Sequence, residues 1–405
     1  MSNTSKITID SAINLSYLAF LIVWQPIKLL TIQVDGKGRI PFVLTFVVLL
    51  FNLLSDKKVR QLMTAKPFII WFVWLLYAFV NMMIVGYHYS QNTPLFYLVN
   101  NLFTPFLALV LTCRECLKNR KRVLKILTCS LALYCVLGFF FMDVVRSDSE
   151  NMLSLGNLLA INGSFLIYLL CAGRNERIMS GITFIITTLL VLLMIISTAT
   201  RKAFGVAMIL FAFYGISIVG KNSKRTIVVL ILALAAYFSV DYMMDHTYLG
   251  ERFSNPGEFA EENIEFDTDN KFLQFVGDRA PHYIYGWELF KQHPVTGIGL
   301  YNFMHYSRYD ERLHTDYMVQ LTENGIVGII LFAFYYLWYI FNLNKLRKVP
   351  GHRGDAIMGF GWIAGLLFLG ITAWTYDIVT VFMCSGIVAS YIYSNKQDIA
   401  TYYER

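Results

Sequence analysis

Charged residues are scarce in this sequence. Of its 405 residues, 15% are Asp, Glu, Lys or Arg, whereas 56% are hydrophobic and the mean hydropathy is +0.52. A soluble domain contains roughly 25% charged and 45–50% apolar residues. This composition excludes a soluble globular protein and predicts a chain embedded in a lipid bilayer. It also argues against a nucleic-acid partner, although the formal net charge is +7.

Cysteine is rare as well, with six residues in the chain. None lies in a predicted extracytoplasmic segment, so a disulfide scaffold is excluded. Cys113 and Cys116 have C-x-x-C spacing, but a zinc site needs two further ligands and none is nearby in the sequence. No His-x-x-x-His pair occurs either. The sequence therefore predicts neither a metal ion nor another cofactor.

Long apolar runs fill most of the chain. A bilayer is spanned by about 17–25 apolar residues. By that criterion we expect about twelve transmembrane helices, at residues 13–34, 40–55, 68–86, 95–112, 123–142, 152–172, 178–196, 203–220, 226–243, 325–343, 357–376 and 377–394. The predicted fold class is an all-α, polytopic integral membrane helical bundle. We interpret residues 1–405 as a single membrane domain.

The charges are distributed unequally between the two predicted faces. With a cytoplasmic N-terminus, the inner segments contain 22 Lys and Arg against 7 Asp and Glu, and the outer segments contain 11 against 20. Cytoplasmic loops are enriched in Lys and Arg in membrane proteins. We therefore expect both termini in the cytoplasm.

One predicted outer loop, residues 244–324 between the ninth and tenth spans, is far longer than the others. A loop of this length is expected to fold against the bundle and to carry function. Residues 258–269 contain six acids and no base. They are interpreted as a solvated loop, with binding of divalent cations or repulsion of misplaced anionic lipid as the alternatives. In residues 279–293 apolar side chains recur at helical spacing, which predicts an interfacial helix that ends at Pro294.

Six of the seven histidines fall on the predicted outer side, at positions 88, 246, 282, 293, 305 and 314. Histidine exchanges a proton near neutral pH, so this distribution is consistent with acid/base chemistry on that face. We interpret five as solvated loop residues and single out His314, which shortly precedes the tenth span. If the backbone there is helical, Asp310 or Glu311 could orient its ring, whereas Asp316 could not.

The predicted outer turn between the seventh and eighth spans contains Arg201 and Lys202. Such cations often only extend from a helix end to the membrane surface. Cations are scarce on this face, however, and the planar fork of arginine suits phosphate. Arg279, at the start of the predicted interfacial helix, could supply a second fork.

Three motifs together resemble the O-antigen ligase and O-antigen polymerase (Wzy) family. They are Thr200-Arg201-Lys-Ala203, the run from Asp278-Arg279 through Trp287 and Phe290 to His293-Pro294-Val-Thr-Gly297-Ile-Gly299-Leu-Tyr-Asn302-Phe303, and His314-Thr-Asp-Tyr317 followed by Glu323-Asn-Gly325-Ile-Val-Gly328. They occur in the order that the family has, with a long loop between the ninth and tenth spans. The sequence departs from the family at Thr315, where asparagine is common.

The resemblance implies a glycosyltransferase that acts on the extracytoplasmic face of the bacterial cytoplasmic (inner) membrane. The donor would be a glycan on undecaprenyl diphosphate, and the acceptor a sugar hydroxyl of a glycan or lipid-linked molecule, with no metal or nucleotide cofactor. His314 would be catalytic, and Arg201, Arg279 and Lys202 would bind the diphosphate. A polysaccharide chain-length regulator is a further implied partner.

We expect a polymerase of surface-polysaccharide repeat units. The alternatives are a ligase that delivers glycan to lipid A core and a non-enzymatic glycolipid flippase. A binding or scaffold protein is a further class.

Overall fold

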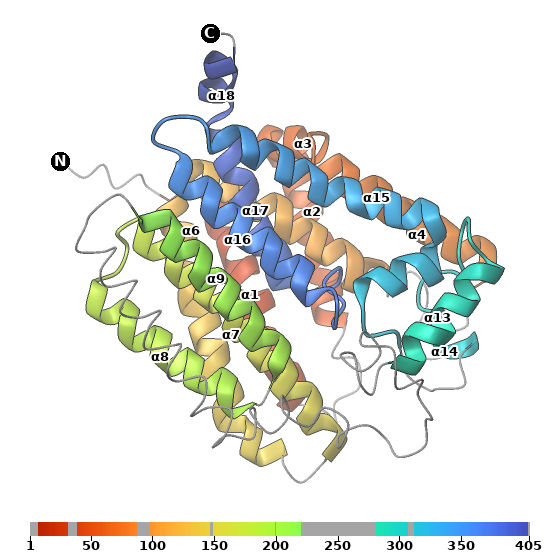
Figure 1. Ribbon diagram of the computed structural model, residues 1–405. Coiled ribbons are helices and arrows are strands. Elements are labelled where there is room, and N and C mark those ends of the chain that lie inside the picture. Colours follow the sequence, from red (N-terminus) through yellow and green to blue (C-terminus); the bar gives the residue numbers. More distant parts are fainter. Residues whose placement is uncertain are drawn as a thin grey trace. The chain divides into compact units, whose positions relative to one another are not determined.

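The computed structural model describes residues 7–30, 39–86, 98–145, 149–198, 200–219, 280–306 and 312–403, and within these ranges all regular structure is helical (Figure 1). The predicted all-α class is therefore confirmed. The predicted ninth span, 226–243, and the acidic stretch 258–269 lie outside the described residues.

Several of the described helices are long and apolar enough to cross a membrane. Five pass as single spans, and the bent pair α2–α3 would be a sixth. Three shorter apolar helices accompany them, at Ile9–Trp24, Gly181–Ser197 and Val379–Ser394. The chain is thus a polytopic helical membrane protein.

The chain divides into two compact units. One comprises residues 1–69, 95–191 and 377–405, and the other residues 70–94 and 192–376. The helices that fall wholly or mainly in the first unit are α1 (Ile9–Leu30), α2 (Arg39–Ser55), α3 (Lys57–Met63), the π-helix η1 (Leu98–Phe103), α6 (Thr104–Val145), α7 (Ser149–Asn175), α8 (Gly181–Ser197), α17 (Val379–Ser394) and α18 (Lys396–Tyr403). Those of the second are α4 (Phe68–Val85), α9 (Arg201–Ile218), α13 (Ala280–Gln292), α14 (Phe303–Tyr306), α15 (Asp316–Leu346) and α16 (Arg353–Leu369).

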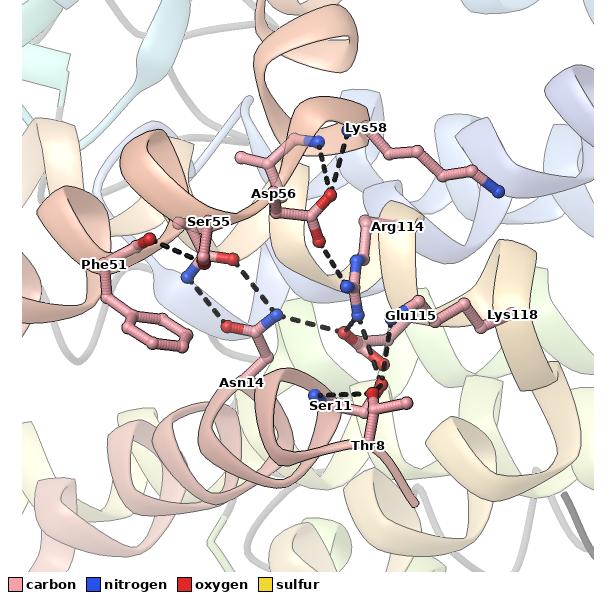
Figure 2. A network of polar contacts seen from close by, with 12 residues as sticks. Thr8, Ser11, Asn14, Phe51, Ser55, Asp56, Lys58, Arg114, Glu115 and Lys118 are labelled. Carbon is pink, nitrogen blue, oxygen red and sulfur yellow. Dashed lines mark hydrogen bonds and ion pairs between the residues drawn. The ribbon is translucent and has the colours of Figure 1, made fainter. Parts of the chain in front are cut away.

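A buried polar network ties three helices of the first unit together (Figure 2). Arg114 of α6 pairs with Asp56, which caps the N-terminus of α3, and with Glu115. The carboxylate of Glu115 accepts a hydrogen bond from Asn14 of α1 at 3.0 Å. Buried charges are tolerated when they are paired and hydrogen-bonded. The network therefore fixes α1, α3 and α6 to one another without any site chemistry.

Small residues set the spacing of α9 and α16 in the second unit. A Cβ on Gly205 of α9 would lie 2.4 Å from the Phe368 ring, and one on Gly361 of α16 would lie 2.6 Å from Cβ of Phe213. The helices are therefore antiparallel and in close contact. The N-terminus of α9 lies beside the C-terminus of α16. The predicted site residues Arg201 and Lys202 are at this end of α9.

Helix α15 is broken at Gly325, which has φ +63° and ψ −166°. The break leaves carbonyl and amide groups without helical partners. The amides of Ile298 and Gly299 donate to the carbonyls of Thr322 and Glu323, at 3.0 and 2.8 Å. The amide of Ile326 donates to the carbonyl of Pro294 at 2.9 Å. We call residues 294–303 the brace, because they replace the missing bonds of the broken helix.

Residues 95–112 and 123–142 were expected as separate helices, and α6 accordingly consists of two helical segments that meet at a kink at Asn119, which has φ −156° and ψ 86°. One other predicted span needs correction. The eleventh span was expected to reach residue 376, whereas α16 ends at Leu369 and a turn segment follows. Residues 370–376 carry no charged side chain, so hydropathy could not reveal the end of α16.

Candidate functional site

The ring of His314 makes stacking contacts with two other rings. Its centroid lies 5.2 Å from the ring of Trp374, with 16° between the planes, and 5.6 Å from the ring of His282, at 21°. The His314 side chain is half-buried and His282 is buried. Stacking of this kind fixes the plane of the imidazole. The structure thus holds the His314 ring in one orientation.

The two residues after His314 anchor the segment that bears Trp374. The backbone amide and hydroxyl of Thr375 donate to the Asp316 carboxylate, at 2.7 and 2.5 Å. The Thr315 hydroxyl and the Asp316 amide both donate to the carbonyl of Gly370, each at 3.0 Å. Residues 315 and 316 therefore hold residues 370–375 against the start of α15. This places the Trp374 ring against the His314 ring.

Arg312 adds a cation to this group of side chains. Its guanidinium lies 5.0 Å from the ring centroid of Tyr301 and 5.9 Å from that of Trp374. Cations are attracted to aromatic faces at such distances. Because Trp374 also stacks on His314, the structure brings Arg312 and His314 together on one indole. Neither Arg312 nor Trp374 was predicted as a site residue, since 62 positions separate the two in the chain.

Glu323 holds the segment from Tyr301 to Phe303 in place, and the Tyr301 ring of this segment faces Arg312. Its buried carboxylate accepts the backbone amides of Tyr301, at 2.9 Å, and Phe303, at 3.2 Å. Arg312 attracts the same carboxylate electrostatically. Glu323 therefore connects the brace, α14 and the ring that faces Arg312. Its place in the third motif is explained by this structural role.

Arg201 and Lys202 are the first two residues of α9, and both are half-buried. Gly205, one turn after Arg201, lies close to the Phe368 ring near the end of α16. Arg201 therefore lies near the C-terminal end of α16, from which the segment that carries Trp374 continues. A helix N-terminus also favours an anion, because its first amides lack helical partners and the helix dipole is positive there.

Helix α13 confirms the helix expected at residues 279–293, with bounds Ala280–Gln292. It packs on α15 at Gly286, whose carbonyl accepts from the Thr322 hydroxyl at 2.9 Å. Ile284 and Trp287 are 44% and 48% exposed on its outer side. This face fits the expected contact with the membrane surface. Arg279, directly before α13, lies outside the described residues.

Residues 312–315 are not helical, so the condition under which Asp310 or Glu311 would orient the His314 ring is not met in the described part of this segment, and the two acids themselves lie outside the described residues. One expectation about the histidines was wrong. His282, taken as a solvated loop residue, is buried against His314. Its position in α13, one turn before Gly286, was a usable signal, because Gly286 marks the face on which α13 packs.

The described residues contain no group of three or more His, Cys, Asp or Glu side chains that could hold a metal ion. Cys113 and Cys116 are both buried in α6. The predicted independence from metals is not tested by this arrangement and stays a prediction.

The fold and the site together define a polytopic helical membrane protein with a stacked histidine at the beginning of a broken membrane helix. Residues 186–333 match the family model described as O-antigen ligase. The match includes α9, α13, the brace and His314, and it confirms the resemblance inferred from the three motifs. This part of the chain therefore carries the domain of the O-antigen ligase family. No curated protein matches the chain.

Proposed function

We propose that this protein transfers a glycan from undecaprenyl diphosphate to a sugar hydroxyl on the extracytoplasmic face of the bacterial cytoplasmic membrane. The reaction we favour is polymerisation of surface-polysaccharide repeat units. The observation that carries the proposal is the fixed, half-buried His314, stacked on Trp374 beside Arg312. It lies within the segment that matches the O-antigen ligase family.

In the proposed reaction, His314 acts as the general base. A sugar hydroxyl is a weak nucleophile, and its attack on C1 of the donor becomes easier as His314 accepts its proton. The new C1–O bond forms while the bond from C1 to the diphosphate oxygen breaks. The electron pair leaves with the undecaprenyl diphosphate. A single displacement of this kind inverts the configuration at C1.

The leaving diphosphate needs cations that are already in place. Arg201, Lys202 and the N-terminus of α9 supply positive charge near the C-terminal end of α16. We assign diphosphate binding to Arg201, Lys202 and Arg279, and we add Arg312 because it shares Trp374 with His314. At an effective dielectric constant of about 20, one charge pair about 4 Å apart is worth roughly 4 kcal/mol. No metal ion is required by this scheme.

The proposed topology and partners apply to the whole chain. Residues 1–405 form one membrane domain, residues 244–324 form its extracytoplasmic loop, and both termini are cytoplasmic. The partners are the lipid-linked donor, a glycan or lipid-linked acceptor, membrane lipids and a polysaccharide chain-length regulator.

The first test is the reaction itself. Purified full-length protein is mixed with a lipid-linked donor and acceptor, and the product mass is measured. We expect longer glycan from the wild type and a rate at least about 100-fold lower for His314→Ala, because general-base catalysis contributes on that scale. His293→Ala is the matched control, because that side chain is exposed and outside the stack, and its rate should be unchanged. Equal rates for His314→Ala and the wild type would contradict the assignment.

The ligase is the second candidate, and the description of the matching family favours it. The same assay separates the two when lipid A core replaces the lipid-linked acceptor. Transfer only to lipid A core would identify a ligase, and transfer to a second lipid-linked repeat unit a polymerase. If substrate moves between leaflets with no product of higher mass, the protein is a flippase.

A further inference from the structure

A second basic site lies at the far end of α9 and α15 from His314. It is a pocket of about 640 Å³ that the last turns of α9, the residues after α15 and the first turns of α16 enclose. Its lining combines cations with apolar side chains: Arg347, Lys348 and Arg353, and Phe213, Ile216, Ile357 and Phe360. The described residues that line it include no carboxylate. The pocket therefore attracts anions.

The position of this pocket relative to the bilayer follows from the length of α15. The helical part after the break, Ile326 to Leu346, has 21 residues. At 1.5 Å per residue it is about 31 Å long, which matches a hydrocarbon core of about 30 Å. Arg347 and Lys348 directly follow this part, so they lie at the membrane surface opposite to His314. In the predicted topology that surface is cytoplasmic.

The lining of the pocket offers both cations for an anionic headgroup and apolar surface for acyl chains. The three cations are exposed at the rim, where an anionic headgroup would be. Ile216, which is 51% exposed, and Phe360 offer apolar surface on the adjoining membrane-spanning helices. Basic pockets between membrane helices on the cytoplasmic side bind the headgroups of anionic lipids. A volume of 640 Å³ also falls within the range typical of small-molecule sites, about 300–1,000 Å³.

We propose that this pocket binds the headgroup of an anionic phospholipid of the cytoplasmic leaflet, with its acyl chains along α9 and α16. Arg347, Lys348 and Arg353 would neutralise the phosphate. The site is separate from the glycosyl-transfer site and does not depend on the function proposed for it.

The experiment uses the full-length protein in detergent, titrated with phosphatidylglycerol or with phosphatidylcholine, and counts bound lipid by native mass spectrometry. We expect a clear preference for phosphatidylglycerol. The triple variant Arg347→Gln, Lys348→Gln, Arg353→Gln should bind it about 100-fold more weakly, since each cation near an anionic lipid contributes about 5-fold. The double variant Arg347→Lys, Arg353→Lys should keep most of the affinity, because it keeps the charge.

The matched control is Lys57→Gln, Lys121→Gln, Lys125→Gln. It removes the same charge from exposed positions outside the pocket and should bind phosphatidylglycerol as the wild type does. Size-exclusion chromatography before titration verifies that each variant is folded. Equal affinity for the two lipids, or an equal loss in the control variant, would overturn the proposal. Displacement of phosphatidylglycerol by millimolar inorganic phosphate would identify a phosphate site instead of a lipid site.

Discussion

At the scale of single residues, the guanidinium of Arg201 is distinguished by its place at the first position of α9. A lysine there would supply the same charge to an anion at the helix N-terminus. Only arginine presents a planar fork that can bond two phosphate oxygens at once. If Arg201 only extends from the helix end to the membrane surface, its charge alone matters and a lysine would serve equally well. A substitution that keeps the charge and removes the fork therefore separates the two interpretations.

We expect Arg201→Lys to lower the rate of glycan transfer by roughly 10-fold, the equivalent of one lost charge-assisted hydrogen bond. The comparison is Arg308→Lys, which makes the same exchange at another arginine of the predicted outer loop that carries no assigned role. The measurement is the initial rate with purified protein and saturating acceptor. If both variants are equally impaired or equally active, bidentate phosphate binding by Arg201 is refuted.

At the scale of elements, the brace and the broken helix α15 depend on each other. A Cβ at Gly297 would lie 2.4 Å from the carbonyl carbon of Glu323, and one at Gly325 would lie 2.2 Å from the carbonyl oxygen of Val295. Both glycines have positive φ, at +72° and +63°. The Asn81 amide of α4 donates to the carbonyls of Thr296 and Glu323, at 2.6 and 3.2 Å. The motif glycines are therefore explained by close backbone packing.

We expect Gly297→Ala and Gly325→Ala each to destabilise the protein by about 2–4 kcal/mol, from the left-handed backbone penalty and from overpacking. Gly351→Ala is the matched control. Gly351 also has positive φ, +85°, but a Cβ there would have no atom within 4 Å, so only the backbone penalty of about 1–2 kcal/mol applies. Equilibrium unfolding in mixed micelles measures all three. Equal losses of unfolding free energy in the three variants would show that close backbone packing at the brace costs nothing beyond the left-handed backbone penalty.

Sequence periodicity predicted elements but not the contacts between them. It predicted α13 to within one residue at each end, because the apolar spacing and Pro294 are local signals. It extended α16 to residue 376 because that run stays apolar, whereas the turn is fixed by Asp316, 59 positions before Thr375. His314 was found from its motif. Its partner Trp374 is set by packing between distant segments and has no local signal, whereas the burial of His282 could have been inferred from its spacing to Gly286.

At the scale of the whole molecule, α9 and α15 give the second unit two chemically different ends. Both helices begin beside the site residues Arg201 and His314 and finish at the basic pocket. The membrane-spanning part of α15 separates the ends by about one hydrocarbon thickness. The predicted excess of Lys and Arg on the inner face agrees with a basic pocket there. Glycan transfer and lipid binding would therefore occur on opposite faces of the bilayer.

This orientation can be tested by labelling single cysteines with a membrane-impermeant maleimide, in a background whose six cysteines are replaced by alanine. We expect Glu262→Cys, in the predicted outer loop, to react in intact spheroplasts. Lys57→Cys and Lys396→Cys should react only after the membrane is permeabilised, because both positions are in segments predicted to be cytoplasmic. Retained glycan transfer verifies the fold of each variant. The reverse labelling pattern would put His314 in the cytoplasm, where the proposed lipid-linked donor would face the wrong side of the membrane.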